Sequence, residues 1–202
     1  ISLSTTALAV LVGVFTAYAL ARLDFPGKGI ITGIILAASM FPGIALVTPL
    51  FQLFGDLNWI GTYRAMIIPN ISFALPLTVY TLVSFFQQLP WELEEAARVD
   101  GATRGQAFRL ILLPLAAPAI FTTAIIAFIT TWNEFMLARQ LSTNATEPVT
   151  VAIARFSGPS AFEFPYAAIM AAGSLVTIPL IIMVLVFQRR IVSGLTAGGV
   201  KG

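Results

Sequence analysis

Few side chains in this sequence are of the kinds that enzymes use for catalysis. The 202 residues include no cysteine and no histidine, so thiol nucleophiles, disulfides and the usual sulfur or imidazole metal ligands are excluded. Among the acidic residues, only Glu134 falls within a stretch that we expect to lie in an apolar environment. A single carboxylate does not supply the paired acid and base that an intramembrane enzyme needs. We therefore expect no catalytic residue, no metal site and no cofactor bound by this chain.

The most polar part of the chain is residues 90–114, and its spacing predicts two short helices joined by a bend. Three glutamates near its start would complement the positive end of a first helix dipole. Gly101 can adopt the positive φ that ends this helix. Thr103, followed three residues later by Gln106, fits a capping box that would begin the second helix. Two small alanines in the first helix would let another protein surface come close.

The elements on either side of this loop are apolar enough to cross a membrane. The chain is 58% hydrophobic and only 10% charged, whereas an average soluble domain has about 25% charged residues. A helix that crosses a hydrocarbon core about 30 Å thick needs about 20 apolar residues. Five stretches meet this requirement: 1–21, 30–53, 66–86, 115–137 and 167–187. The predicted fold is an all-α bundle of membrane helices that forms one domain, residues 1–202.

The distribution of basic residues predicts how the bundle is oriented. One set of connections holds eight of them: Arg22, Lys28, Arg98, Arg104, Arg109, Arg189, Arg190 and Lys201. The other set holds three: Arg64, Arg139 and Arg155. Because positive charge in short loops is retained in the cytoplasm, loop 90–114 and tail 188–202 are predicted to be cytoplasmic, and connection 138–166 external. The net charge of +2 is too dispersed to indicate binding of nucleic acid.

A signature within residues 90–114 narrows the function. Its elements are Glu95-Ala96-Ala97, Gly101 after three further residues, Ile111 after nine more, and Leu113-Pro114. This pattern resembles the loop signature of permease subunits of bacterial ABC importers. An ordinary amphipathic loop between two membrane helices would not need every element at this spacing. In that family the loop forms the coupling helix, which docks in a cleft on the ATP-hydrolysing subunit.

The resemblance implies roles for individual residues of the loop. Glu95 would make a charged contact with the ATPase, Ala96 and Ala97 would pack closely, and Gly101 would form the bend. The implied ATPase-coupling residues are Glu95, Ala96, Ala97, Asp100, Gly101, Ile111 and Pro114. The chain has no phosphate-binding loop of the Gly-x-x-x-x-Gly-Lys-Ser/Thr type, so ATP and Mg would bind on the partner. The alternative for Glu95 is a local role at the helix dipole.

A second resemblance covers essentially the whole chain. The residues that carry it are Gly194-Leu-Thr-Ala-Gly-Gly-Val-Lys-Gly202 after Gln188-Arg-Arg, then Trp132-Asn-Glu-Phe, Ser2-Leu3, Tyr18-Ala-Leu-Ala-Arg22 and Phe25-Pro-Gly. They resemble the second permease of maltose-type sugar importers, whose tail reaches into the ATPase dimer. This implies that Gly198, Gly199 and Lys201 contact the ATPase. The family's first helix is absent, and the start at Ile1 predicts that the natural N-terminus lies upstream.

Together the resemblances imply a transport subunit and not an enzyme. The expected substrate is a di- or oligosaccharide like maltose or trehalose, and the alternative is another solute such as a polyol or a glycerol phosphate. The expected partners are a homologous second permease, an ABC ATPase dimer, an extracytoplasmic solute-binding protein and the lipid bilayer. The expected location is the cytoplasmic membrane of a bacterium, with the C-terminus in the cytoplasm. A simple membrane anchor would not need the coupling signature.

Polar residues inside the predicted spans are candidates for the substrate path. An unpaired carboxylate in lipid would cost several kcal/mol, so Glu134 should face a partner or a wet cavity. Trp132 and Asn133 beside it, with Asn70 and Tyr80 on another span, offer the amide, hydroxyl and aromatic surfaces that a sugar contacts. Alternatively, Glu134 lies at the membrane interface and Asn70 bridges helices. The sequence favours these structural roles over direct contact with the sugar.

Overall fold

The structure is a computed structural model that describes residues 1–156 and 165–197. Every regular element in these ranges is helical, which confirms the predicted all-α class. The long helices are α1 (Ser2–Arg22), α2 (Lys28–Ser39), α3 (Val47–Asp56), α4 (Tyr63–Gln88), α7 (Leu113–Trp132) and α10 (Tyr166–Ala197). The short ones are η1 (Gly43–Leu46), α5 (Glu92–Val99), α6 (Arg104–Ala107), the π turn η2 (Phe108–Leu112), α8 (Met136–Leu141) and α9 (Val149–Ala154).

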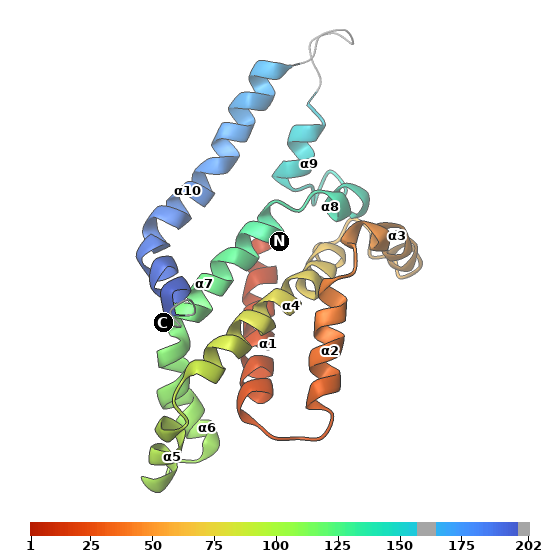
Figure 1. Cartoon of the computed structure of the whole chain (residues 1–202). Helices are drawn as coiled ribbons and strands as arrows, with labels where there is room; N and C mark the ends of the chain where they lie inside the picture. Colours follow the sequence, from red (N-terminus) through yellow and green to blue (C-terminus); the bar gives the residue numbers. More distant parts are fainter. Residues whose placement is uncertain (157–164, 198–202) are drawn as a thin grey trace.

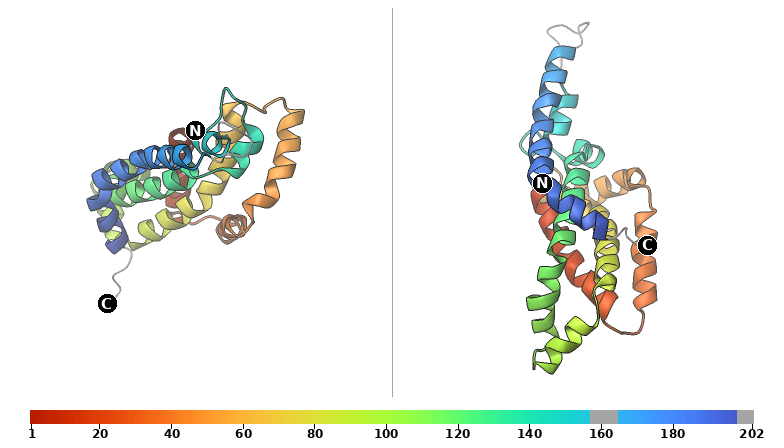
Figure 2. Two further views of the ribbon diagram at one scale, coloured as in Figure 1. Left: turned by 90° about the horizontal axis from the view of Figure 1, so that it is seen from above. Right: turned by 60° about the vertical axis from the view of Figure 1, so that its left-hand side comes forward.

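Helices α1, α4 and α7 form the centre of the bundle (Figure 1). Helix α1 approaches α4 most closely at Gly13, where an added β-carbon would lie 2.5 Å from Thr78 Cγ2. Leu82, Phe86 and Leu112 are fully buried in the apolar core that these helices share. Helix α10 runs beside α7 (Figure 2) and adds an outer layer.

Several buried threonines form hydrogen bonds within their own helices. The hydroxyls of Thr78, Thr123 and Thr131 donate to the backbone carbonyl oxygen four residues earlier, at 2.8, 2.8 and 3.0 Å. Such bonds satisfy a hydroxyl where no water is present. The helices can therefore carry these residues through an apolar layer at little cost.

Among the described residues, four helices are long and apolar enough to cross a membrane: Ser2–Arg22, Tyr63–Gln88, Arg104–Trp132 and Tyr166–Phe187. The predicted span 30–53 is not one straight helix, because α2 and the segment Gly43–Asp56 meet at an angle of 89°. The bend begins just before Pro42, which disfavours the helical conformation of the residue before it and cannot donate a backbone N–H. The predicted count of five holds only if this bent pair is one broken span.

The predicted span 115–137 was wrong at both ends. Helix α7 ends at Trp132, and upstream it continues without a break through the π turn to Arg104. Glu134 therefore lies in the link between α7 and α8 and not inside a membrane helix. Connection 138–166 is partly helical, since it includes the end of α8 and all of α9.

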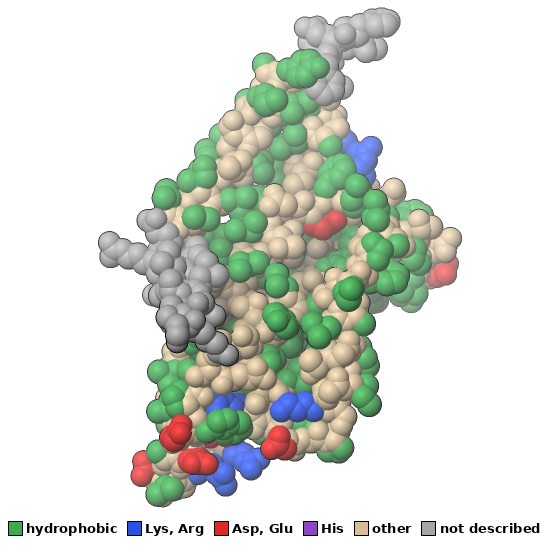
Figure 3. Space-filling view, in the orientation of Figure 1, with side chains coloured by type: hydrophobic (Ala, Val, Ile, Leu, Met, Phe, Trp, Pro, Cys, Tyr) green, Lys and Arg blue, Asp and Glu red, His purple; other side chains and the backbone are tan. Residues whose placement is uncertain are grey.

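The two ends of the bundle differ in composition. Helices α5 and α6 lie at one end, and α3, α8 and α9 lie toward the other (Figure 1). Charged side chains gather around α5 and α6, and the face drawn in Figure 3 is mostly apolar or uncharged between the two ends. This distribution matches a molecule whose middle lies in lipid and whose ends lie in water.

Candidate functional site

The first helix of the polar loop ends in a Schellman motif at Gly101. This glycine has φ = +88°, a conformation that costs other residues about 1–2 kcal/mol. Its N–H donates to the carbonyl of Arg98 at 3.1 Å, and the N–H of Ala102 donates to the carbonyl of Ala97 at 2.9 Å. These two bonds satisfy carbonyls that the helix end would leave free. The predicted positive φ is confirmed, and the bend after α5 has a fixed geometry.

The second helix begins with the predicted capping box. The Thr103 N–H donates to Gln106 Oε1 at 2.7 Å, and the Gln106 N–H donates to Thr103 Oγ1 at 3.3 Å. This helix is not separate, because α6 continues through the π turn directly into α7. Ile111 lies half-buried in the π turn, and Pro114 lies exposed in the first turn of α7. A movement of α6 would therefore act on α7 without an intervening joint.

The predicted coupling residues fall on two faces of α5. Glu95, Ala96 and Asp100 are exposed, as is Val99, which has 87% of its surface accessible. Ala97 is turned inward and is only 6% exposed, so of the two alanines only Ala96 is available to another protein. The outward face of α5 thus offers two carboxylates, a small residue and a large apolar side chain.

The inward face of α5 is tied to the end of α1 by polar contacts that sequence reasoning missed. Glu94 is 6% exposed, and its Oε1 accepts a hydrogen bond of 3.2 Å from Tyr18 Oη. Arg22 donates to the carbonyl of Leu89, and its guanidinium carbon lies 4.4 Å from the ring centre of Trp91. The sequence signal for these contacts was the spacing of Tyr18 and Arg22, which lie four residues apart on one face of α1.

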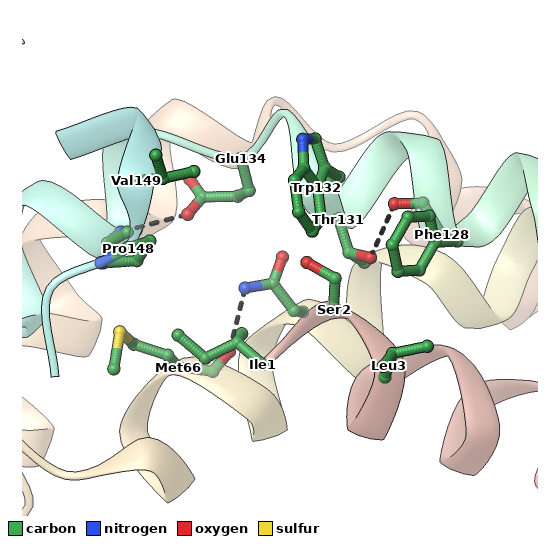
Figure 4. Close-up of a pocket in the computed structure, with 12 residues that line it drawn as sticks. Ile1, Ser2, Leu3, Met66, Phe128, Thr131, Trp132, Glu134, Pro148 and Val149 are labelled. Carbon is green, nitrogen blue, oxygen red and sulfur yellow. Dashed lines mark hydrogen bonds between the residues drawn. The ribbon is translucent and has the colours of Figure 1, made fainter. Parts of the chain in front are cut away.

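A cavity of about 300 Å³ lies near the start of α1, at the end of the bundle away from α5 (Figure 4). It brings together three of the predicted substrate-path residues, Asn70, Trp132 and Glu134. The full lining is Ile1, Ser2, Leu3, Met66, Asn70, Phe128, Thr131, Trp132, Glu134, Ala138, Pro148 and Val149. Tyr80 is 61% exposed and is not part of the lining, and neither is the exposed Asn133.

Most polar groups in this cavity already have partners in the chain. The Glu134 carboxylate accepts hydrogen bonds from the backbone N–H of Leu137 at 2.8 Å and of Ala138 at 3.0 Å, so it caps the start of α8. Asn70 Nδ2 donates to the carbonyl of Met66 at 2.9 Å. The buried Trp132 Nε1 has no hydrogen-bond partner among the described residues.

Two other predictions concern the tail and metal binding. Gly198, Gly199 and Lys201 lie outside the described residues. Within the described ranges there is no group of three or more acidic side chains that could hold a metal ion.

Comparisons with known proteins place the chain among transport proteins. A family model described as "Binding-protein-dependent transport system inner membrane component" matches residues 9–196. The chain is 52% identical to a trehalose transport system permease protein of Mycobacterium tuberculosis, over 100% of this chain and 74% of the relative. It is 46% identical to a trehalose/maltose transport system permease protein of Thermococcus litoralis, over 92% and 67%. It is 42% identical to a sulfoquinovosyl glycerol transport system permease protein of Agrobacterium fabrum, over 100% and 70%.

Solved structures share the fold at low sequence identity. A chain of a bacterial ABC transporter involved in the import of the acidic polysaccharide alginate aligns with a TM-score of 0.69 at 24% identity, covering 93% of this chain and 73% of that one. A chain of the MetNI methionine ABC transporter in an inward-facing conformation aligns with a TM-score of 0.73 at 18% identity, covering 96% and 92%. Since the family model spans nearly the whole chain, the protein belongs to the family of inner membrane components of binding-protein-dependent transport systems.

Proposed function

We propose that the chain is a transmembrane permease subunit of an ATP-driven, binding-protein-dependent importer of a sugar, of the maltose or trehalose kind. The observation that carries this is the 52% identity to a trehalose permease over the full length of the chain. The relative named for trehalose and maltose supports the same substrate class. Transport of a glycerol-containing solute is the second candidate, and the 42% identity to the sulfoquinovosyl glycerol permease favours it.

In this proposal α5 is the coupling helix that binds the ABC ATPase. Its exposed face, with Glu95, Ala96, Val99 and Asp100, has the small and charged groups that docking needs. The Schellman motif at Gly101 and the continuous path from α6 into α7 make the loop stiff. ATP and Mg bind on the ATPase, and their hydrolysis drives alternating access through this stiff contact.

The opposite end of the bundle is external and receives the solute-binding protein. The elements there are α8 and α9. Glu147, in the link between them, forms an ion pair with Arg155, which directly follows α9: Arg155 Nη1 lies 2.8 Å from Glu147 Oε1. A cavity lined by Asn70, Trp132 and Glu134 lies at this end, which supports placing the solute path beside it. This orientation puts α5 and the C-terminus in the cytoplasm of a bacterium, in keeping with the family's place in the inner membrane.

A second, homologous permease completes the path. Helix α2 has no buried residue, and none of the apolar window in α10 is buried within the chain. Lipid covers part of the exposed surface of α2 and α10. The second permease covers the surface that lines the solute path, because polar groups that line a path cannot face lipid. The C-terminal tail, with Gly198, Gly199 and Lys201, reaches the ATPase dimer.

The test is reconstitution of the intact subunit with its neighbouring permease, ATPase and binding protein in liposomes. We expect ATP-dependent uptake of trehalose or maltose that stops when the binding protein is left out. Uptake of glycerol phosphate or a polyol in place of either sugar would favour the second candidate. Full activity without the second permease would contradict the heterodimer, and no ATP-dependent uptake of any of these solutes would overturn the proposed function.

A further inference from the structure

We propose that Tyr18, Arg22 and Glu94 form a junction that makes the coupling helix α5 and the cytoplasmic end of α1 move as one unit. The inference rests on the proposed function, since it assumes that an ATPase moves α5. The three residues are positioning residues: they hold α5 against α1 and do not contact ATP or the solute.

The junction joins segments that are far apart in the sequence. The Tyr18–Glu94 hydrogen bond spans 76 residues, and the bond from Arg22 to the carbonyl of Leu89 spans 67. Leu89 lies at the end of α4 and Trp91 lies directly before α5, so Arg22 holds the link between these two helices. Any shift of α5 must either break these bonds or carry α1 with it.

An aromatic cluster locks the ring of Tyr18 in place. Its ring centre lies 4.4 Å from that of Phe108, the first residue of the π turn, and 6.2 Å from that of Phe86 on α4. Phe86 is fully buried and Phe108 is 8% exposed. Because the ring cannot move freely between these neighbours, the hydroxyl of Tyr18 transmits a displacement of Glu94 to α1.

The polar atoms of the junction are only partly satisfied. Glu94 Oε2 and the Nε and Nη1 atoms of Arg22 are buried without a hydrogen-bond partner among the described residues. Arg22 itself is 4% exposed. Apolar residues of similar size would fill such a place at lower cost. A buried arginine and glutamate on facing helices are therefore poor choices for stability alone, and good ones for a contact whose geometry must be unique.

The experiment uses the complete complex with variants of the intact subunit. Tyr18→Phe removes one hydroxyl, and Glu94→Gln removes one charge with no change in shape. The matched controls are Tyr63→Phe and Asp56→Asn, whose side chains are exposed at the start of α4 and at the end of α3. The measurement is the number of sugar molecules taken up per ATP hydrolysed, at equal amounts of assembled complex.

We expect both junction variants to lower uptake per ATP by about tenfold, the factor that one hydrogen bond to a charged group corresponds to, while the controls stay at the wild-type ratio. The double variant should be no worse than the more severe single one, because both changes act on the same Tyr18–Glu94 hydrogen bond: Tyr18→Phe removes the donor, and Glu94→Gln replaces the charged acceptor by a neutral one. The uptake per ATP of Arg22→Lys should lie between that of the wild type and that of Arg22→Gln, since lysine keeps the charge and loses the guanidinium fork.

Wild-type ratios in both Tyr18→Phe and Glu94→Gln would overturn the junction, as would effects that add in the double variant. Loss of uptake that only follows loss of assembled complex would assign the residues to folding and also overturn it.

A second measurement separates the junction from the proposed function. Hydrogen exchange of the last turn of α1 is compared with and without bound ATPase, and no solute is needed. We expect ATPase binding to slow exchange at the end of α1 in the wild type and in Asp56→Asn, but not in Glu94→Gln. An unchanged α1 in the wild type would overturn the junction even if transport is normal. Slowed exchange in a complex that transports no tested solute would support the junction while the proposed substrate class fails.

Discussion

The hydroxyl of Thr150 donates a hydrogen bond of 3.0 Å to the backbone carbonyl of Glu134, which ties the first turn of α9 to the link after α7. The side chain of Glu134 meanwhile caps α8 through the N–H groups of Leu137 and Ala138. One residue therefore organises three helices at this end of the bundle. Its carboxylate is occupied by the backbone, which favours the structural role over direct contact with a solute.

Replacing Glu134 by Ala should lower the free energy of unfolding by about 1–2 kcal/mol, the usual cost of losing a helix N-cap. Glu134→Gln keeps one acceptor oxygen and should cost less. The measurement is thermal unfolding of the purified subunit in detergent. An unchanged unfolding temperature in Glu134→Ala, together with a raised KM for sugar uptake, would instead indicate that the carboxylate binds the solute.

Two glycines of the polar loop should respond in opposite ways to alanine. Gly101 has φ = +88° and no atom within 4 Å of an added β-carbon, so Gly101→Ala is penalised only by its backbone, by about 1–2 kcal/mol. Gly105 lies in α6 with equally open surroundings, and alanine there should stabilise the helix by about 1 kcal/mol. Differential scanning calorimetry of Gly101→Ala and Gly105→Ala checks the two predicted shifts in unfolding temperature. Equal shifts in unfolding temperature would contradict the left-handed geometry at Gly101.

Gly13 should not accept alanine unless Thr78 is changed as well. The added β-carbon would lie 2.5 Å from Thr78 Cγ2, and overpacking of this kind typically costs about 1–3 kcal/mol. Thr78→Ser removes that methyl group and keeps the hydroxyl that bonds to the carbonyl of Ala74. Gly13→Ala should therefore lower the unfolding temperature, and the Gly13→Ala, Thr78→Ser double variant should recover most of the loss. A double variant as unstable as the sum of its parts would rule out this contact.

The sequence predicted best those features that depend on neighbouring residues. The Thr103–Gln106 capping box and the positive φ of Gly101 are local, because each needs only a few residues of chain. The spans that became α1, α4 and α10 are long, continuous apolar runs, and length alone identifies them. The family signature also lies within one short loop.

The missed features have specific physical causes. The sequence stays apolar at Phe135 and Leu137, so hydropathy alone does not locate the end of α7 at Trp132. The Glu134 side chain, just after that end, caps the next helix. The predicted span 30–53 contains Pro42, where the structure bends by 89° because proline interrupts the helix. The contact of Tyr18 with Glu94 depends on tertiary packing, and the spacing of Tyr18 and Arg22 indicates only that both side chains share one face of α1.

Glu95 should be needed for coupling but not for folding. Its side chain is exposed on α5, so Glu95→Lys leaves the core of the subunit intact and reverses the charge that the ATPase would meet. We expect uptake and binding-protein-stimulated ATP hydrolysis to fall together by about tenfold or more, with an unchanged unfolding temperature. Asp56→Lys, an equal charge reversal at an exposed site at the end of α3, is the control. Normal uptake and normal stimulated hydrolysis in Glu95→Lys would contradict the docking role of this face.

Single cysteines should be accessible from opposite sides of the membrane at the two ends of the bundle. The 202 residues include no cysteine, so each introduced thiol is the only one within them. Ala145, between α8 and α9, and Val99, at the end of α5, are both exposed. The excess of basic residues on the α5 side predicts that this side is cytoplasmic. In intact cells, a membrane-impermeant maleimide should therefore label Ala145→Cys and spare Val99→Cys. Val99→Cys should react once the membrane is opened, and added ATPase should slow that reaction because α5 is then covered. Labelling of Val99→Cys alone in intact cells would invert the orientation, and both docking assignments would fail with it.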